Sequence, residues 1–332
     1  MEPPIRPPIR PPHRAGDAVT GTMPRVATAG DAGTHPIATN RTGQQPSALP
    51  GRSPCEGAVP TLGVALTAMN SMRTLEPTIR SVVGLGALVL VIDSGSTDGS
   101  QERARALGAT VEERPWAGHV AQKQYALDRC RALRPELEWL LLLDSDEAVD
   151  PTLAASIRAA TNAVGGGSAA DPVGWELQRP LVLHDRTLHH TFQPEWRLRL
   201  VRVGRFRVAG TPPHDRLAVD GPVGRLDGLL LHDSWANASD MLRRAEGYAT
   251  IAARQEATGG GLFDIAVRPP AAFLKQYILR RGFRDGWRGL VAAGGAAAAT
   301  LMKHIAIAER NGLRAEARSA SVPLRSTPTD PA

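Results

Sequence analysis

Short apolar runs alternate with amphipathic stretches between residues 62 and 162. Three of these runs are too short to cross a membrane and lack the polar positions of a half-buried strand, so they predict strands buried on both faces: Leu62–Leu66, Leu88–Ile92 and Trp139–Leu143. The stretches between them have the character of helices at residues 74–83, 101–107 and 119–133, with a short strand at Thr110 and Val111. This alternation predicts an α/β fold with a doubly wound, mostly parallel sheet and helices on both faces.

The pattern changes after residue 164. Strand-like segments are expected at residues 174–183, 197–203 and 226–232, followed by a helix from Ala238 to Gln255. Asp150 and Pro151 have the order of an N-cap followed by proline at the first helical position, which predicts one further helix before the change. We therefore expect a mixed second half that packs beside the first.

The C-terminal part is basic and amphipathic. Phe273, Leu274, Tyr277 and Ile278 form an apolar stripe flanked by lysine and arginine, which is typical of a segment that lies in a membrane interface. The apolar stretch Leu290–Met302 is expected to be too short to span a bilayer. A pair of helices packed on the core is the alternative.

Composition narrows the class of protein. The 332 residues carry a net charge of +6, and from Arg268 onward eleven basic residues face four acidic ones, so the excess is terminal. Because the basic excess is terminal and has little aromatic interleaving, nucleic-acid binding is disfavoured. The two cysteines, of which Cys130 has the position of a buried structural thiol, and the absence of a signal peptide predict a reducing cytoplasm.

Acidic residues follow two of the predicted strands. Asp144 and Asp146 come directly after the leucine run, where a pair spaced i, i+2 can reach one divalent metal that holds a diphosphate. Asp93 ends the strand before it and opens a turn of glycine and hydroxyl residues that includes Ser94 and leads through Asp98 into a helix N-terminus. Each feature alone also fits an ordinary capped turn.

Basic residues and a histidine–carboxylate pair complete the candidate site. Arg114 and Lys123 can neutralise phosphate charge, although a lysine on a helix is otherwise unremarkable. His214 and Asp215 lie in a glycine- and proline-rich loop, where a carboxylate is well placed to act as a general base. The other histidines, at positions 184, 189, 190 and 232, show no spacing typical of a metal site.

In combination these motifs resemble a known family. Thr67-Ala-Met-Asn70, then VIDSGSTDGS, ERPWAGHVAQKQYAL and LLLLDSDE, look like family 2 glycosyltransferases of the GT-A fold. PEWRLRLVRVGRFRVAG, PPHDRLAVDG and LLLHDSW resemble the acceptor half of the lipopolysaccharide core β-1,4-glucosyltransferase branch. The resemblance covers about residues 61–310.

The resemblance implies roles for individual residues. Thr67, Asn70, Asp93, Ser94, Asp98, Arg114, Lys123 and Asp144 fall on the donor side, Asp146 with Asp144 on the metal, and Asp215 with His214 on the base. The sequence also departs from the family. The usual Thr-Lys-Asn-Glu is here Thr67-Ala-Met-Asn70, so its lysine and glutamate are missing or displaced. Lys123-Gln124 stands in place of Arg-Asn, and His214-Asp215 stands in place of His-Glu and is one methylene shorter.

Composition and pattern together predict an order of domains. A proline-rich, disordered tail at 1–59 precedes a nucleotide-sugar-binding half at 60–163, an acceptor-side half at 164–262, a basic amphipathic helical region at 263–311 and a disordered tail at 312–332.

The implied reaction is inverting transfer of a hexose such as glucose from a UDP-sugar to a lipid-linked or cell-envelope glycan, with Mg²⁺ or Mn²⁺. The enzyme is expected in the cytoplasm, peripheral on the inner membrane face. Two alternatives remain: a sugar-nucleotide pyrophosphorylase, which would want a glycine-rich loop where Thr67–Arg73 stands, and a catalytically impaired, membrane-associated carbohydrate-binding module.

Overall fold

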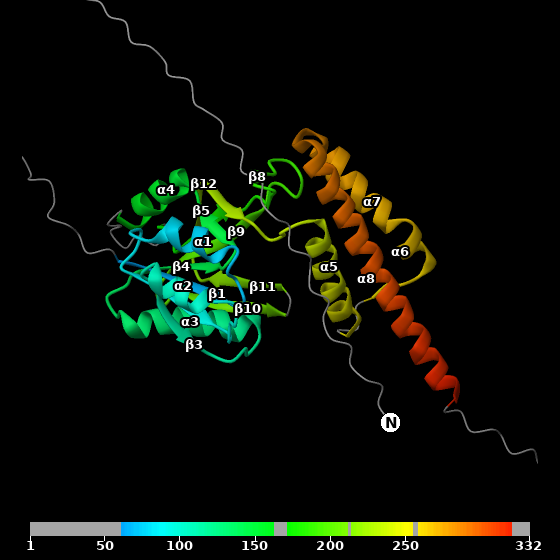
Figure 1. Ribbon diagram of the computed structural model, residues 1–332, viewed down its shortest axis with the longest axis horizontal. Helices are drawn as coiled ribbons and strands as arrows, with labels where there is room; N and C mark the ends of the chain where they lie inside the picture. The colour runs from blue at the N-terminus through cyan, green and yellow to red at the C-terminus, as the bar shows by residue number, and fades with distance from the viewer. Residues whose placement is uncertain (1–60, 163–170, 212–213, 255–257, 321–332) are drawn as a thin grey trace, which may run out of the picture. The chain divides into compact units, whose positions relative to one another are not determined.

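In the computed structural model, which describes residues 61–162, 171–211, 214–254 and 258–320, the first half alternates strands and helices as predicted (Figure 1). The predicted tail at 1–59 and most of the loop at 164–172 lie outside these residues. The elements of this half, in chain order, are β1 (Leu62–Ala68), α1 (Leu75–Val82), β2 (Leu88–Asp93), α2 (Ser100–Ala106), β3 (Thr110–Glu113), α3 (His119–Leu133), β4 (Trp139–Asp144), β5 (Glu147–Val149) and α4 (Pro151–Asn162).

The second half is mixed, also as predicted. It contains β6 (Gly174–Gln178), β7 (Val182–Leu183), β8 (Arg186–Thr187), β9 (Trp196–Arg202), β10 (Phe206–Thr211), β11 (His214–Val219), β12 (Val223–His232) and α5 (Ala238–Arg254). The hairpin β10–β11 was expected to be a loop. Its strands are short and two prolines stand between them in the sequence, which hides their alternation of apolar and polar residues.

One sheet connects the two halves. Its strand order is β3-β2-β1-β4-β9-β6-β12-β5. The first four strands in this order, β3, β2, β1 and β4, are parallel to one another, whereas β9 is antiparallel to both β4 and β6. The predicted parallel sheet is therefore confirmed for the first four strands. The reversal at β9 places strands of the second half directly beside the carboxyl end of β4.

The leucine run of β4 is buried on both faces, as its lack of polar positions requires. Leu141 and Leu143 belong to the core under α1 and α4, whereas Leu140 and Leu142 belong to the opposite core under α3 and the hairpin. Cys130 lies in this second core, and burial raises the pKa of its thiol to about 12. The thiol is structural, as the sequence predicted.

The C-terminal part is helical. It comprises α6 (Leu262–Ala266), α7 (Arg268–Leu274), a π-helical turn η1 (Lys275–Leu279), a 3-10 turn η2 (Gly282–Asp285) and α8 (Gly286–Ala320), and α8 runs beside α5 and α7 (Figure 1). The long helix continues past the expected boundary at residue 311. Within the described residues, α8 together with the turn before it is long and apolar enough to cross a membrane by length and composition, which the sequence did not predict.

Candidate active site

The carboxyl ends of three parallel strands meet at one pocket. The register pairs Thr67 of β1 with Asp144 of β4, and Ala68 of β1 with Asp93 of β2. A pocket of about 640 Å³ opens beside them. Six of the residues singled out from the sequence line it: Thr67, Ser94, Lys123, Asp144, Asp146 and Asp215.

Asp144 is held between two cations. Its Oδ1 lies 2.6 Å from Lys123 Nζ of α3, and its Oδ2 lies 2.7 Å from Arg199 Nη2 of β9. Burial would raise the pKa of the Asp144 carboxyl, but these two charges hold it well below its ordinary value. Each oxygen therefore forms an ion pair, and Asp144 is held in place at the end of β4.

Asp144 belongs to a longer chain of alternating charges. Lys123 Nζ also lies 2.8 Å from Asp215 Oδ2. On the other side, Arg199 binds Glu147, which is completely buried, and Glu147 lies 2.8 Å from Arg179. Arg179 and Arg197 both bind Glu195. Four cations therefore alternate with four carboxylates in this ion-pair chain, which in order of contact runs Asp215, Lys123, Asp144, Arg199, Glu147, Arg179, Glu195 and Arg197. The network is neutral, which buried charges require.

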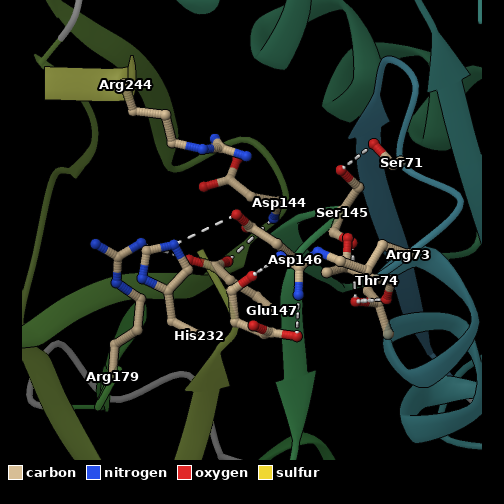
Figure 2. Close-up of polar contacts among 12 residues, drawn as sticks. Ser71, Arg73, Thr74, Asp144, Ser145, Asp146, Glu147, Arg179, His232 and Arg244 are labelled. Carbon is tan, nitrogen blue, oxygen red and sulfur yellow. Dashed lines mark hydrogen bonds and ion pairs between the residues drawn. The ribbon is translucent and has the colours of Figure 1, made fainter. Parts of the chain in front are cut away.

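Asp146 stands outside this chain. It follows the strand in the turn to β5, and its Oδ2 lies 3.5 Å from His232 Nε2 at the end of β12 (Figure 2). Burial would raise the pKa of Asp146, but His232 and the charge of Arg179 outweigh it and lower this pKa, so the side chain is ionised at neutral pH. Asp146 thus presents a negative charge to the pocket and forms no ion pair with the four cations of the ion-pair chain.

Asp146 and His232 fit a divalent metal. Their separation of 3.5 Å exceeds a normal hydrogen bond and compares with the roughly 3 Å between adjacent ligands of an octahedral Mg²⁺ whose bonds are about 2.1 Å long. His232 Nδ1 is buried without a hydrogen-bond partner, so the ring is not committed elsewhere through that atom. No cluster of three or more metal-binding side chains occurs among the described residues, so substrate oxygens would have to complete the coordination.

Asp215 is carried by the unpredicted hairpin. Its Oδ2 accepts the bond from Lys123, while its Oδ1 accepts no hydrogen bond in the part of the chain that the structure describes. The side chain is 12% exposed and lines the pocket. One carboxylate oxygen is therefore available to a substrate hydroxyl. The side chain of His214 lies outside the described residues.

The remaining predicted donor residues do not line the pocket. Asp93 is buried and accepts hydrogen bonds from the backbone N–H groups of Gly95 and Ser96, and so shapes the turn beside Ser94. Asn70 accepts from Thr97 N, and Asp98 from Met72 N, so these two tie the loops after β1 and β2 together.

Arg114 is also turned away. Its guanidinium stacks 4.1 Å from the Tyr125 ring and donates to Ala121 O.

Sequence reasoning missed much of the site. Arg179, Arg199, Glu147 and His232 come from the second half or follow the acidic pair directly, and each is buried or nearly so. Arg199 could have been noticed because it is a charged residue at an inward position of β9, where an apolar residue is expected. For His232 no spacing signal exists, because its partner Asp146 is far away in the sequence.

The parallel strands of this α/β fold thus end in carboxylates beside a pocket, next to the mixed second half. Residues 64–196 match the family model of glycosyl transferase family 2. These residues therefore form a family 2 glycosyltransferase domain, and the protein is a glycosyltransferase.

The chain is similar to other proteins that are named as glycosyltransferases and to parts of solved structures. A lipopolysaccharide core biosynthesis glycosyltransferase of Rhizobium meliloti is 26% identical over 69% of this chain and 85% of its own length. An uncharacterized glycosyltransferase of Rickettsia prowazekii is 23% identical over 67% of this chain and 78% of its own. Among solved structures, glucosyl-3-phosphoglycerate synthase from Mycobacterium tuberculosis is 23% identical with a TM-score of 0.29; the match covers 37% of this chain and 44% of that one.

Proposed function

We propose that the enzyme transfers a hexose, with inversion, from a UDP-linked donor to a lipid-linked or cell-envelope glycan in a metal-dependent reaction. The observation that carries the proposal is the placement of two ionisable carboxylates with different surroundings on one pocket. Asp146 is ionised and free of the ion-pair chain, and Asp215 has one oxygen open to the pocket. The first suits a bound cation and the second suits a hydroxyl group.

On the donor side, Thr67 and Ser94 lie where a nucleoside would approach the ends of β1 and β2. Asp146 and His232 would hold the metal. When bound, a divalent metal offsets the negative charge that grows on the departing diphosphate. Lys123 and Arg199 already neutralise Asp144, so its part in this proposal is to fix the turn that presents Asp146.

On the acceptor side, Asp215 accepts the proton of the attacking hydroxyl. The acceptor oxygen forms a new bond to the anomeric carbon as the bond from that carbon to the diphosphate breaks, and the nucleoside diphosphate leaves with its electron pair. Because attack and departure occur on opposite faces, the configuration inverts. Trp196, Arg216 and Tyr248 line the acceptor half of the same pocket and can contact a sugar ring and its polar groups.

Two further expectations concern the acceptor and the location. The relative in lipopolysaccharide core biosynthesis supports a cell-envelope glycan as acceptor. The basic, apolar C-terminal helices support action at the inner membrane surface.

The test is a panel of UDP- and GDP-linked sugars, with nucleotide release measured with and without Mn²⁺. We expect release from one UDP-sugar that depends on metal. Asp146→Asn should abolish Mn²⁺ binding, read directly by electron paramagnetic resonance, and reduce turnover by a factor of about 100 or more. Asp128→Asn, an exposed acid on α3, is the control. Full turnover without metal, or an Asp146→Asn variant that still binds Mn²⁺ normally, would refute the assignment.

A further inference from the structure

The segment 262–290 exposes an unusual number of large apolar side chains. Leu262, Phe263 and Leu279 are 84%, 67% and 77% exposed. Val267 at the cap of α6, Leu274 of α7 and Ile278 of η1 are exposed as well. Exposed apolar surface of this extent marks an interaction site. The exposed apolar side chains of residues 262–290 are called the apolar face below.

Unpaired cations border the apolar face. Lys275, Arg281 and Arg284 are exposed and make no side-chain hydrogen bond or ion pair with any described residue. The two acids of the segment are already committed: Asp264 binds Arg268 at 2.6 Å, and Asp285 accepts the backbone N–H groups of residues 189–191. The partner must therefore be both apolar and anionic, which is the chemistry of a phospholipid headgroup region.

The apolar face is fixed to the catalytic unit. Arg280 Nη1 donates to Gln193 O at 3.0 Å, and Arg288 Nε donates to Leu183 O at 3.0 Å. Leu181, Leu183 and Leu188 pack with Ala292 in a small core of their own. Residues 183–193 thus anchor these helices, and the chain continues from there to Trp196 of the pocket.

Packing argues against a membrane-spanning α8. Met241, Ala245 and Ala249 of α5 are buried, and a Cβ at Gly295 of α8 would lie 2.2 Å from Met241 Sδ, so the two helices are in close contact. Arg244 and Tyr248 of α5 line the pocket. If α8 crossed a bilayer with α5 attached, the charges of α5 would enter hydrocarbon, where they are costly.

We infer that residues 262–290 lie flat in the headgroup region of an anionic phospholipid bilayer, with the apolar face at the acyl boundary and Lys275, Arg281 and Arg284 on lipid phosphates, while α8 stays packed on α5. The inference rests on the proposed function only in that a lipid-linked acceptor gives such an enzyme a reason to bind a membrane.

The experiment is flotation of the full chain with vesicles of phosphatidylcholine, with and without phosphatidylglycerol, at low and high salt. We expect binding only to the anionic vesicles, weakened by salt. Replacing Lys275, Arg281 and Arg284 with Gln should weaken binding roughly a hundredfold, at about one factor of five per basic residue. A matched variant replaces three exposed arginines elsewhere and should bind normally: Arg131, Arg158 and Arg207.

A second pair of variants tests the apolar contribution. Ile278→Glu with Leu279→Glu should abolish flotation, whereas Val83→Glu with Val223→Glu, at comparably exposed positions, should not. After flotation, alkaline carbonate should release the protein, because an interfacial segment is extracted and a spanning helix is retained.

Measuring donor hydrolysis without vesicles distinguishes a failure of the proposed function from a failure of the proposed membrane surface. Normal hydrolysis without flotation overturns the membrane surface and leaves the function standing. Flotation without hydrolysis of any nucleotide sugar refutes the function and supports the surface. Resistance to carbonate overturns the in-plane arrangement.

Discussion

Replacing Lys123 with methionine tests the centre of the ion-pair chain. Lys123 is 5% exposed and touches two carboxylates, at 2.6 Å to Asp144 and 2.8 Å to Asp215. Breaking a buried ion pair from one side costs about 3–5 kcal/mol because the remaining charge is uncompensated. Here Asp144 keeps Arg199, and Asp215 faces the pocket, so we expect a loss of about 2–3 kcal/mol in the free energy of unfolding.

The catalytic effect of this substitution separates two roles. If Lys123 gripped the donor diphosphate, as the resemblance implies, losing a charge-assisted bond of about 1.5–3 kcal/mol would raise the donor KM by a factor of roughly 10 to 150. In the structure the ammonium is already shared by two carboxylates. We therefore expect it to position Asp215: kcat should fall about a hundredfold, while donor KM should change less than about threefold.

The assay combines urea unfolding with steady-state kinetics. Arg131→Met, an exposed change on the same helix, is the control and should shift stability by no more than about 0.5 kcal/mol. In a double variant with Asp215→Asn, the added Lys123→Met should reduce kcat little further, because the positioned group is gone. A large rise in donor KM with normal kcat would show that Lys123 serves the donor directly and would refute this reasoning.

Three further predictions concern the fold around the site. The pKa of Asp144 is held well below its ordinary 3.8, so its ionised form stabilises the fold above pH 3.8. That contribution is lost as the pH falls below 3.8, and Asp144→Asn should flatten the pH dependence of urea unfolding in this acid range. Asp285→Ala removes the acceptor of three backbone N–H groups and should cost about 2–3 kcal/mol in thermal or urea unfolding, whereas Asp285→Asn should retain part of it. Gly228 has φ +101°, and a Cβ there would lie 2.2 Å from Leu153 N, so Gly228→Ala should destabilise the protein by about 2 kcal/mol or more; an unchanged midpoint would contradict the packing of α4 on β12.

The first half of the fold could be predicted because its signals are local. A buried strand such as β4 has an unbroken apolar run, and α3 begins and ends at the predicted residues, His119 and Leu133. Once the strands are parallel, their carboxyl ends must share one edge. Thr67 and Asp144 are therefore brought together by the fold itself.

The acceptor half was predicted less completely because its contacts are non-local. In the hairpin, Phe206 and Val208 pair with Val219 and Leu217 and pack in the core, but the glycine and prolines nearby in the sequence favoured a loop. Arg199 and His232 gain their roles from partners that are distant in the sequence. Only the antiparallel return of β9 beside β4 makes Arg199 a neighbour of Asp144.

The two acids of the Asp-Ser-Asp motif lie in different surroundings because different strands contact them. Asp144 is the last residue of a strand, so its side chain is fixed in register between α3 and β9, where two cations meet it. Asp146 lies beyond the strand, where the turn carries it toward β12 and His232. Because the ion-pair chain is already neutral without Asp146, adding a divalent cation there does not require any cation of the chain to leave. The proposed metal site at Asp146 is compatible with this charge balance, and a variant that breaks the ion-pair chain should weaken metal binding only through the position of Asp146.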